Sequence, residues 1–215
     1  MKKFTNLISV FIVSTVFFGC SAKKSDELFN LTPNQWYSEI MKDIKDLDLD
    51  AADKHFVSFS SEHVASPLLE ETTLILAQAN IDEENYTRAN DYLNEYIKRF
   101  GTEEKIEFAR FMKIKANFDS FSKPNRNQKL MKNSINEIKL FSIDYPRSKY
   151  RPLVDTMLLK LKLADHQLDK EILDLYERTG RKESAEFYSN KIENSVLKDT
   201  EAIKPTSPWY RRVFE

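Results

Sequence analysis

Glycine is so scarce in this chain that several classes of fold are excluded before any motif is considered. The 215 residues contain three glycines, Gly19, Gly101 and Gly180. Phosphate-binding loops, dinucleotide-binding turns and many tight turns between strands need glycine, because φ is positive there or because the backbone approaches a ligand closely. We therefore do not expect an α/β nucleotide-binding enzyme, and we expect a fold whose connections work without glycine.

The beginning of the chain has the pattern of a secretory signal peptide. Two lysines precede an uncharged apolar stretch, residues 4–18, which Gly19 and Cys20 follow. The stretch is shorter than the roughly 20 apolar residues of a membrane-spanning helix, which makes an uncleaved anchor the weaker alternative. The segment Phe17-Phe18-Gly19-Cys20 resembles a bacterial lipobox. We predict that residues 1–19 are removed and that Cys20, the single cysteine, carries the lipid.

The residues after the leader are expected to form a tether and then a globular part. Residues 20–32 are mostly polar and show no apolar periodicity, as in a flexible tether. Ser21, where an inner-membrane lipoprotein would carry Asp, favours the outer membrane by resemblance to lipoprotein sorting rules. The 33 basic and 34 acidic residues are intermixed along the chain, so no basic stripe predicts a nucleic-acid partner.

From residue 33 to residue 196 the apolar residues recur at intervals of three and four, which predicts an all-α fold. Helix-breaking residues divide this part into segments one or two helices long. The breaks fall at Pro67, Gly101, residues 122–128, Pro146 and Gly180.

Within these segments a repeated pattern predicts about four degenerate tetratricopeptide-like helix hairpins, stacked as a solenoid. A small residue recurs in the second helix of each hairpin, and in the first three units an apolar residue follows it four positions later. The small residues are Ala52, Ala89, Ser134 and Ala185. A helical bundle with coincidental alanines is the alternative. Residues 197–215 contain two prolines and are too short for another hairpin, so we expect an extended tail.

Three segments carry a resemblance to a known family. They are Pro33 to Tyr37, the run from Ala89 to Phe100, and Tyr145-Pro146-Arg147-Ser148-Lys149-Tyr150; the turn ending at Gly180 adds to them. Together with the leader, they resemble the BamD family, the helical lipoproteins of the outer-membrane β-barrel assembly machinery. Better-known members continue into a fifth repeat, for which this chain has no room.

The resemblance implies a function and its partners. It implies an outer-membrane lipoprotein that faces the periplasm, binds the barrel-forming assembly subunit and unfolded outer-membrane barrel proteins, and has no catalytic activity. The alternatives are another periplasmic helical-repeat lipoprotein, such as a secretin pilotin or a cell-wall scaffold, and a murein-cleaving lipoprotein. The last of these would need an additional catalytic domain.

The first helices of the hairpins are expected to line a groove that takes an extended peptide. In the family, the N-terminal repeats are thought to receive the terminal segment of unfolded barrels, and we carry this role over as a hypothesis. The candidate groove residues are Tyr37, Met41, Ile44, Lys45, Leu74, Gln78, Ile81, Phe108 and Met112.

The end of the tail forms a second candidate site. Aromatic residues and arginines, the types that most often dominate interface energies, cluster there. They are Trp209, Tyr210, Arg211, Arg212 and Phe214. We interpret the cluster as a docking motif for the barrel-forming subunit; a cap folded onto the last helix pair and a disordered tail are the alternatives.

No pattern predicts a metal, a cofactor or catalysis. Asp46, Asp48 and Asp50 alternate like the start of a calcium loop, but Ala51 stands where that loop requires glycine. The three histidines have no zinc-site spacing, and no serine lies in a nucleophile elbow.

Overall fold

The structure is a computed structural model that describes residues 28–121 and 128–200. Within these ranges the chain forms helices and no strands. They are α2 (Pro33–Lys45), α3 (Leu49–Glu62), α4 (Leu68–Asp82), α5 (Tyr86–Phe100), α6 (Glu103–Asp119), α7 (Gln128–Asp144), α8 (Arg151–Arg178) and α9 (Lys182–Glu193). The predicted all-α fold is confirmed.

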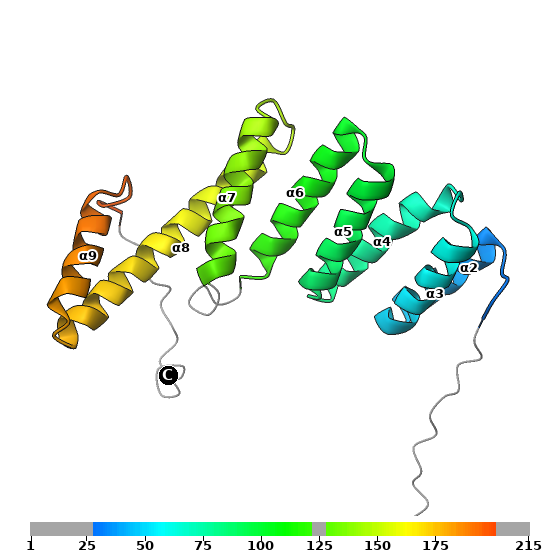
Figure 1. The fold of residues 1–215 in the computed structure, drawn as a ribbon, viewed down its shortest axis with the longest axis horizontal. Helices are drawn as coiled ribbons and strands as arrows, with labels where there is room; N and C mark the ends of the chain where they lie inside the picture. The colour runs from blue at the N-terminus through cyan, green and yellow to red at the C-terminus, as the bar shows by residue number, and fades with distance from the viewer. Residues whose placement is uncertain (1–27, 122–127, 201–215) are drawn as a thin grey trace, which may run out of the picture. The chain divides into compact units, whose positions relative to one another are not determined.

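The helices pair in chain order as hairpins, and each hairpin packs on the next (Figure 1). The hairpins are α2–α3, α4–α5, α6–α7 and α8–α9, and neighbouring hairpins meet through α3 and α4, α5 and α6, and α7 and α8. First helices also contact one another, α2 with α4 and α6 with α8. This is the helix-hairpin arrangement of a tetratricopeptide-like fold, as the repeated pattern predicted.

Local sequence signals fix the beginnings of the first two helices. Thr32 and Gln35 form a capping box: the Gln35 amide donates to Thr32 Oγ1 at 3.4 Å, and the Thr32 amide donates to Gln35 Oε1 at 2.9 Å. Pro33 occupies the first helical turn, where no amide donor is needed. Asp48 caps α3 by accepting from the Ala51 amide at 3.0 Å. An aspartate of the rejected calcium pattern therefore has a structural role as a helix cap.

The small residues of the repeated pattern lie inside the protein in the first three hairpins. Ala52 and Ala89 are 0% exposed and Ser134 is 2% exposed, whereas Ala185 is half-buried. The apolar residues four positions after the first three are also buried; they are Phe56, Leu93 and Ile138. A small side chain at the crossing of two helices lets their backbones approach, and the larger residue fills the space beside it.

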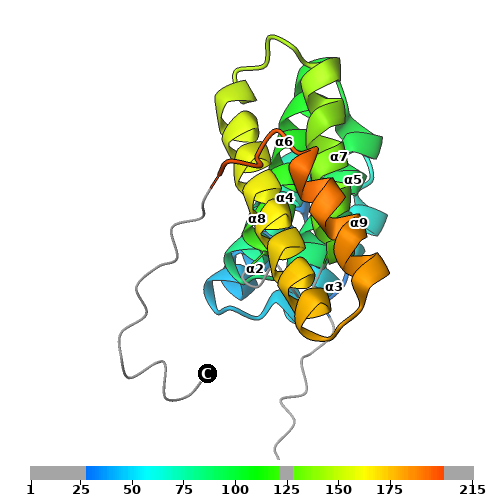
Figure 2. The ribbon, with the colours of Figure 1, turned by 90° about the vertical axis from the view of Figure 1, so that its left-hand side faces the viewer.

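The longest helix, α8, packs against its hairpin partner α9 (Figure 2) and also against the third hairpin. Val154, Leu161 and Leu168 join the apolar core formed with α6 and α7. Nearer its C-terminal end, α8 holds α9 through the ion pair between Lys191 Nζ and Asp169 Oδ1, at 2.6 Å. None of the side chains of α9 is buried, so that helix depends on α8 for its packing. None of the helices in the described part of the chain is both long and apolar enough to cross a membrane.

Candidate functional site

A line of side-chain contacts joins the first helices of successive hairpins. Tyr37 Oη on α2 donates to Glu71 Oε1 on α4 at 3.1 Å, and Glu70 Oε1, one residue earlier on α4, lies 2.6 Å from Lys105 Nζ on α6. Phe111 on α6 then stacks on Tyr150, which precedes α8, with ring centroids 4.3 Å apart. The first helices, on which the groove was predicted, therefore form one connected row.

Hydrogen bonding and burial shift the pKa values along this row. The hydrogen bond from Lys105 lowers the pKa of Glu70, which Tyr96 also contacts through its hydroxyl at 3.0 Å. Burial, followed by the hydrogen bond to Glu70, raises the pKa of Tyr96 to about 12. Burial and Glu71 likewise raise the pKa of Tyr37. At neutral pH the phenols of Tyr37 and Tyr96 therefore keep their protons and donate hydrogen bonds.

In the first hairpin, the predicted groove residues lie on α2, and their side chains differ in how much of each is exposed. Tyr37, Met41 and Ile44 are half-buried, and Lys45 is exposed. The half-buried residues follow one another at intervals of three and four, so they share one face of the helix. That face presents apolar atoms while it contacts α4 through Tyr37.

The groove residues of the second and third hairpins divide into two groups. Leu74 and Phe108 are half-buried, and Gln78 is exposed, with its Nε2 donating to Asp82 Oδ1 at 2.7 Å. In contrast, Ile81 is 6% exposed and belongs to a small core with Ala89 and Ala116, against which Met112 packs. Ile81 and Met112 thus stabilise the contact between two hairpins, and we leave them out of the surface proposed below.

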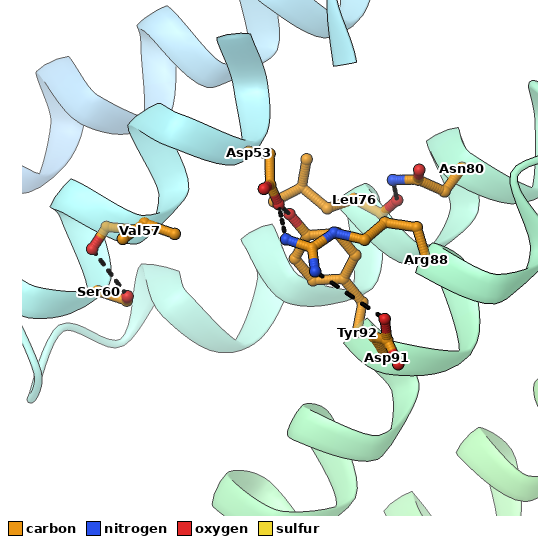
Figure 3. A network of polar contacts seen from close by, with 8 residues as sticks. All are labelled: Asp53, Val57, Ser60, Leu76, Asn80, Arg88, Asp91 and Tyr92. Carbon is orange, nitrogen blue, oxygen red and sulfur yellow. Dashed lines mark hydrogen bonds and ion pairs between the residues drawn. The ribbon is translucent and has the colours of Figure 1, made fainter. Parts of the chain in front are cut away.

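A polar network on the second helices ties the first hairpin to the second (Figure 3). Asp53 Oδ1 on α3 accepts hydrogen bonds from Arg88 Nη2 and from Tyr92 Oη on α5. The Arg88 guanidinium also lies 5.0 Å from the centre of the Tyr92 ring, and Tyr92 meets Phe56 edge to face at 5.5 Å. Burial and the bond to Asp53 raise the pKa of Tyr92, and that carboxylate raises the pKa of Arg88.

A hollow of about 790 Å³ opens beside this network. Its lining is polar and carries more carboxylates than cations, with Asp50, Asp53 and Asp91 around Arg88. Asn90 closes one side by donating from Nδ2 to Asn117 Oδ1 at 2.7 Å. Over the described residues, no three His, Cys, Asp or Glu side chains are grouped so that they could hold a metal ion. The hollow suits water or a polar chain segment.

The Asp53 network was not predicted from the sequence. The one available signal was the spacing of Arg88 and Tyr92, which places them on the same face of a helix. The lipid-attachment residue Cys20 and the tail residues Trp209, Tyr210, Arg211, Arg212 and Phe214 lie outside the described residues, so their assignments stay predictions.

The helix hairpins and the connected row of first helices define a helical-repeat protein with an extended surface. Comparison with known proteins gives its family. Residues 30–191 match the model of the YfiO family, described as "Outer membrane lipoprotein". The chain is also 32% identical over 210 residues to the protein named "Outer membrane protein assembly factor BamD" of Helicobacter pylori, an alignment that covers 97% of this chain and 94% of that protein. The chain belongs to this family of outer membrane lipoproteins, which confirms the resemblance found in the sequence.

Proposed function

We propose that this protein is anchored to the outer membrane through lipid on Cys20, faces the periplasm, and takes part in the assembly of outer-membrane β-barrel proteins. In this role it acts as a non-catalytic scaffold, binding the barrel-forming assembly subunit and unfolded barrel clients. The first helices supply the client surface through Tyr37, Met41, Ile44, Leu74 and Phe108.

One observation carries the proposal: the similarity to the assembly factor of Helicobacter pylori runs through almost the whole of both chains. A shared helical-repeat fold alone would support only a general binding role, because one fold serves many functions. Similarity that also extends beyond the repeats, into the terminal segments of both proteins, supports a shared role for the complete chain.

The geometry of the first helices supports the client-binding part of the proposal. An unfolded segment offers free backbone hydrogen-bonding groups and alternating side chains. The row of first helices offers half-buried apolar side chains beside polar ones, such as Gln78 and Glu71. Shallow apolar contacts with a few polar groups suit partners that share chemistry rather than one sequence.

Site-specific photo-crosslinking in cells tests the proposal. A photoreactive residue at Tyr37 or Leu74 of the full-length lipoprotein is expected to capture newly made barrel proteins. Val57 provides the matched control, because it is an apolar residue of the second helix α3 and is 57% exposed. Equal capture from Val57 would contradict the assignment of the surface. Recovery of a secretin, with no barrel-assembly subunit or client, would replace the proposal by the pilotin alternative.

A further inference from the structure

An unfilled apolar cavity of about 310 Å³ lies where α6, α7 and α8 meet. Phe118, Phe121, Met131, Leu161 and Ala164 line it, together with the charged residues Asp119 and Lys160. Met131 and Leu161 are core residues, but Phe118, Phe121 and Ala164 are only partly buried although they pack against that core. The cavity is therefore an open edge of the core shared by the last two hairpins.

The chain returns to α8 at its last described residue, Thr200. After α9, residues 194–200 turn back across α8 (Figure 2), and Lys170 Nζ donates to the Thr200 carbonyl at 2.9 Å. Ala164 and Leu161 lie six and nine residues before Lys170 on the same helix. At about 1.5 Å per residue, this separation is roughly 9 to 14 Å along the helix axis.

The tail that follows Thr200 is long enough to reach the cavity. Trp209 is the ninth residue after Thr200, and nine extended residues span about 30 Å. This length covers the distance along α8 and a path around the helix. Pro205 and Pro208 favour an extended approach.

The size and composition of the cavity select an aromatic occupant from the tail. An apolar cavity of about 150 Å³ holds a benzene ring, so one of 310 Å³ is large enough for an indole. The segment 122–127, which follows Phe121, consists of Ser, Lys, Pro, Asn, Arg and Asn and has no large apolar side chain to offer. The tail offers Trp209, followed by Tyr210.

We propose that the tail folds back along α8 and inserts the indole of Trp209 into the cavity between α6, α7 and α8. The tail then completes the core of the last two hairpins of its own chain. This role uses the aromatic cluster within the fold, in place of the docking motif for a partner.

Tryptophan fluorescence of the full-length lipoprotein in detergent tests this inference. The chain has two tryptophans, and Trp36 is fully buried. Subtracting the spectrum of the Trp209→Phe variant from that of the unmodified protein isolates the emission of Trp209. We expect that emission to lie at shorter wavelength than in urea and to resist quenching by acrylamide. Ala164→Arg, which places a charged side chain in the cavity, is expected to abolish both effects.

Leu159→Arg is the matched control, because Leu159 is an exposed residue of α8 that does not line the cavity. It should leave the emission of Trp209 unchanged, and circular dichroism should show helix retained in both arginine variants. Three results would overturn the proposal. The first is solvent-like emission of Trp209 in the unmodified protein, and the second is a short-wavelength emission that survives Ala164→Arg and so reflects detergent or another contact. The third is a short-wavelength emission that depends on protein concentration or on added barrel-forming subunit.

Discussion

The serine at the helix crossing of the third hairpin offers a sharp test of the repeat architecture. Ser134 occupies the position that Ala52 and Ala89 hold in the first two hairpins, and it is 2% exposed. Its hydroxyl oxygen is buried and has no hydrogen-bond partner among the described residues. Replacing Ser134 by alanine removes this hydroxyl and restores the residue that the other hairpins use. We therefore expect Ser134→Ala to stabilise the protein.

Two effects, both of which favour alanine, set the expected increase in the free energy of unfolding. A buried hydroxyl without a partner costs about 1 to 3 kcal/mol, and we take the lower end because removing the oxygen leaves a small void. Alanine also favours a helix over serine by about 0.5 kcal/mol. The expected increase in the free energy of unfolding is about 1.5 kcal/mol, which corresponds to a rise in Tm of roughly 3 to 6 °C for a chain of this size.

Urea and thermal denaturation of a soluble form lacking Cys20, followed by far-ultraviolet circular dichroism, measure this gain. Ser38→Ala on the exposed face of α2 isolates the effect of helix propensity. The reciprocal change Ala89→Ser should destabilise the protein, because it buries a hydroxyl at the equivalent position. If Ser134→Ala gains no more than Ser38→Ala, the hydroxyl has a favourable partner and the reasoning fails.

Further predictions concern other contacts. Tyr92→Phe keeps the ring but loses the bond to Asp53, so we expect urea denaturation to show a loss of about 1 to 1.5 kcal/mol; an unchanged midpoint would refute the bond. The pKa of Tyr96 rises from 10.0 to about 12 on folding, so the unfolded state loses its proton first; Tm should fall between pH 10 and 12, and less steeply in Tyr96→Phe. Gly180 has φ of 71° and no atom within 4 Å of an added Cβ, so Gly180→Ala should cost about 1 kcal/mol through backbone strain alone, and Gly180→Asn less. Cys20→Ala should block acyl labelling and release the protein from membranes, or leave it held by an uncleaved leader; normal labelling in that variant would refute the lipid site.

The helix boundaries could be predicted because the residues that set them act locally. Pro33 and Pro67 fix φ and lack an amide donor, and Gly180 takes a positive φ, so each marks a helix end whatever packs around it. The small residues Ala52 and Ala89 were found for a similar reason, because their spacing to the next apolar residue is a property of one helix.

The orientation of α4 could not be predicted, because this helix has no single apolar face. Its buried residues follow one another at intervals of three and four and so share one face, which packs against α2, α3 and α5, but apolar residues such as Leu74 and Ile75 lie outside that face. Thr72 and Thr73 are among them, and their hydroxyls donate to the carbonyls of Leu68 and Leu69 within the helix. Because polar residues such as these occupy buried positions of α4, the spacing of its apolar residues does not show that Ile81 is a core residue.

The pairing of Asp53 with Arg88 and Tyr92 also lay beyond prediction. The partners are 35 and 39 residues apart in the chain, and they meet only because two hairpins stack. Among 33 basic and 34 acidic residues, nothing local marks which carboxylate meets which guanidinium.

The uninterrupted course of α8 has a mechanical consequence. At about 1.5 Å per residue, its 28 residues form a rod of roughly 42 Å, one part of which packs against α6 and α7 while another part packs against α9. Because no turn interrupts α8, the helix itself forms a continuous link between α9 and the core of the third hairpin. A force applied to α9 is transmitted through this single continuous helix into the core of the third hairpin. A force applied at the C-terminal end of α8 therefore reaches α6 and α7 without first extending a flexible connection.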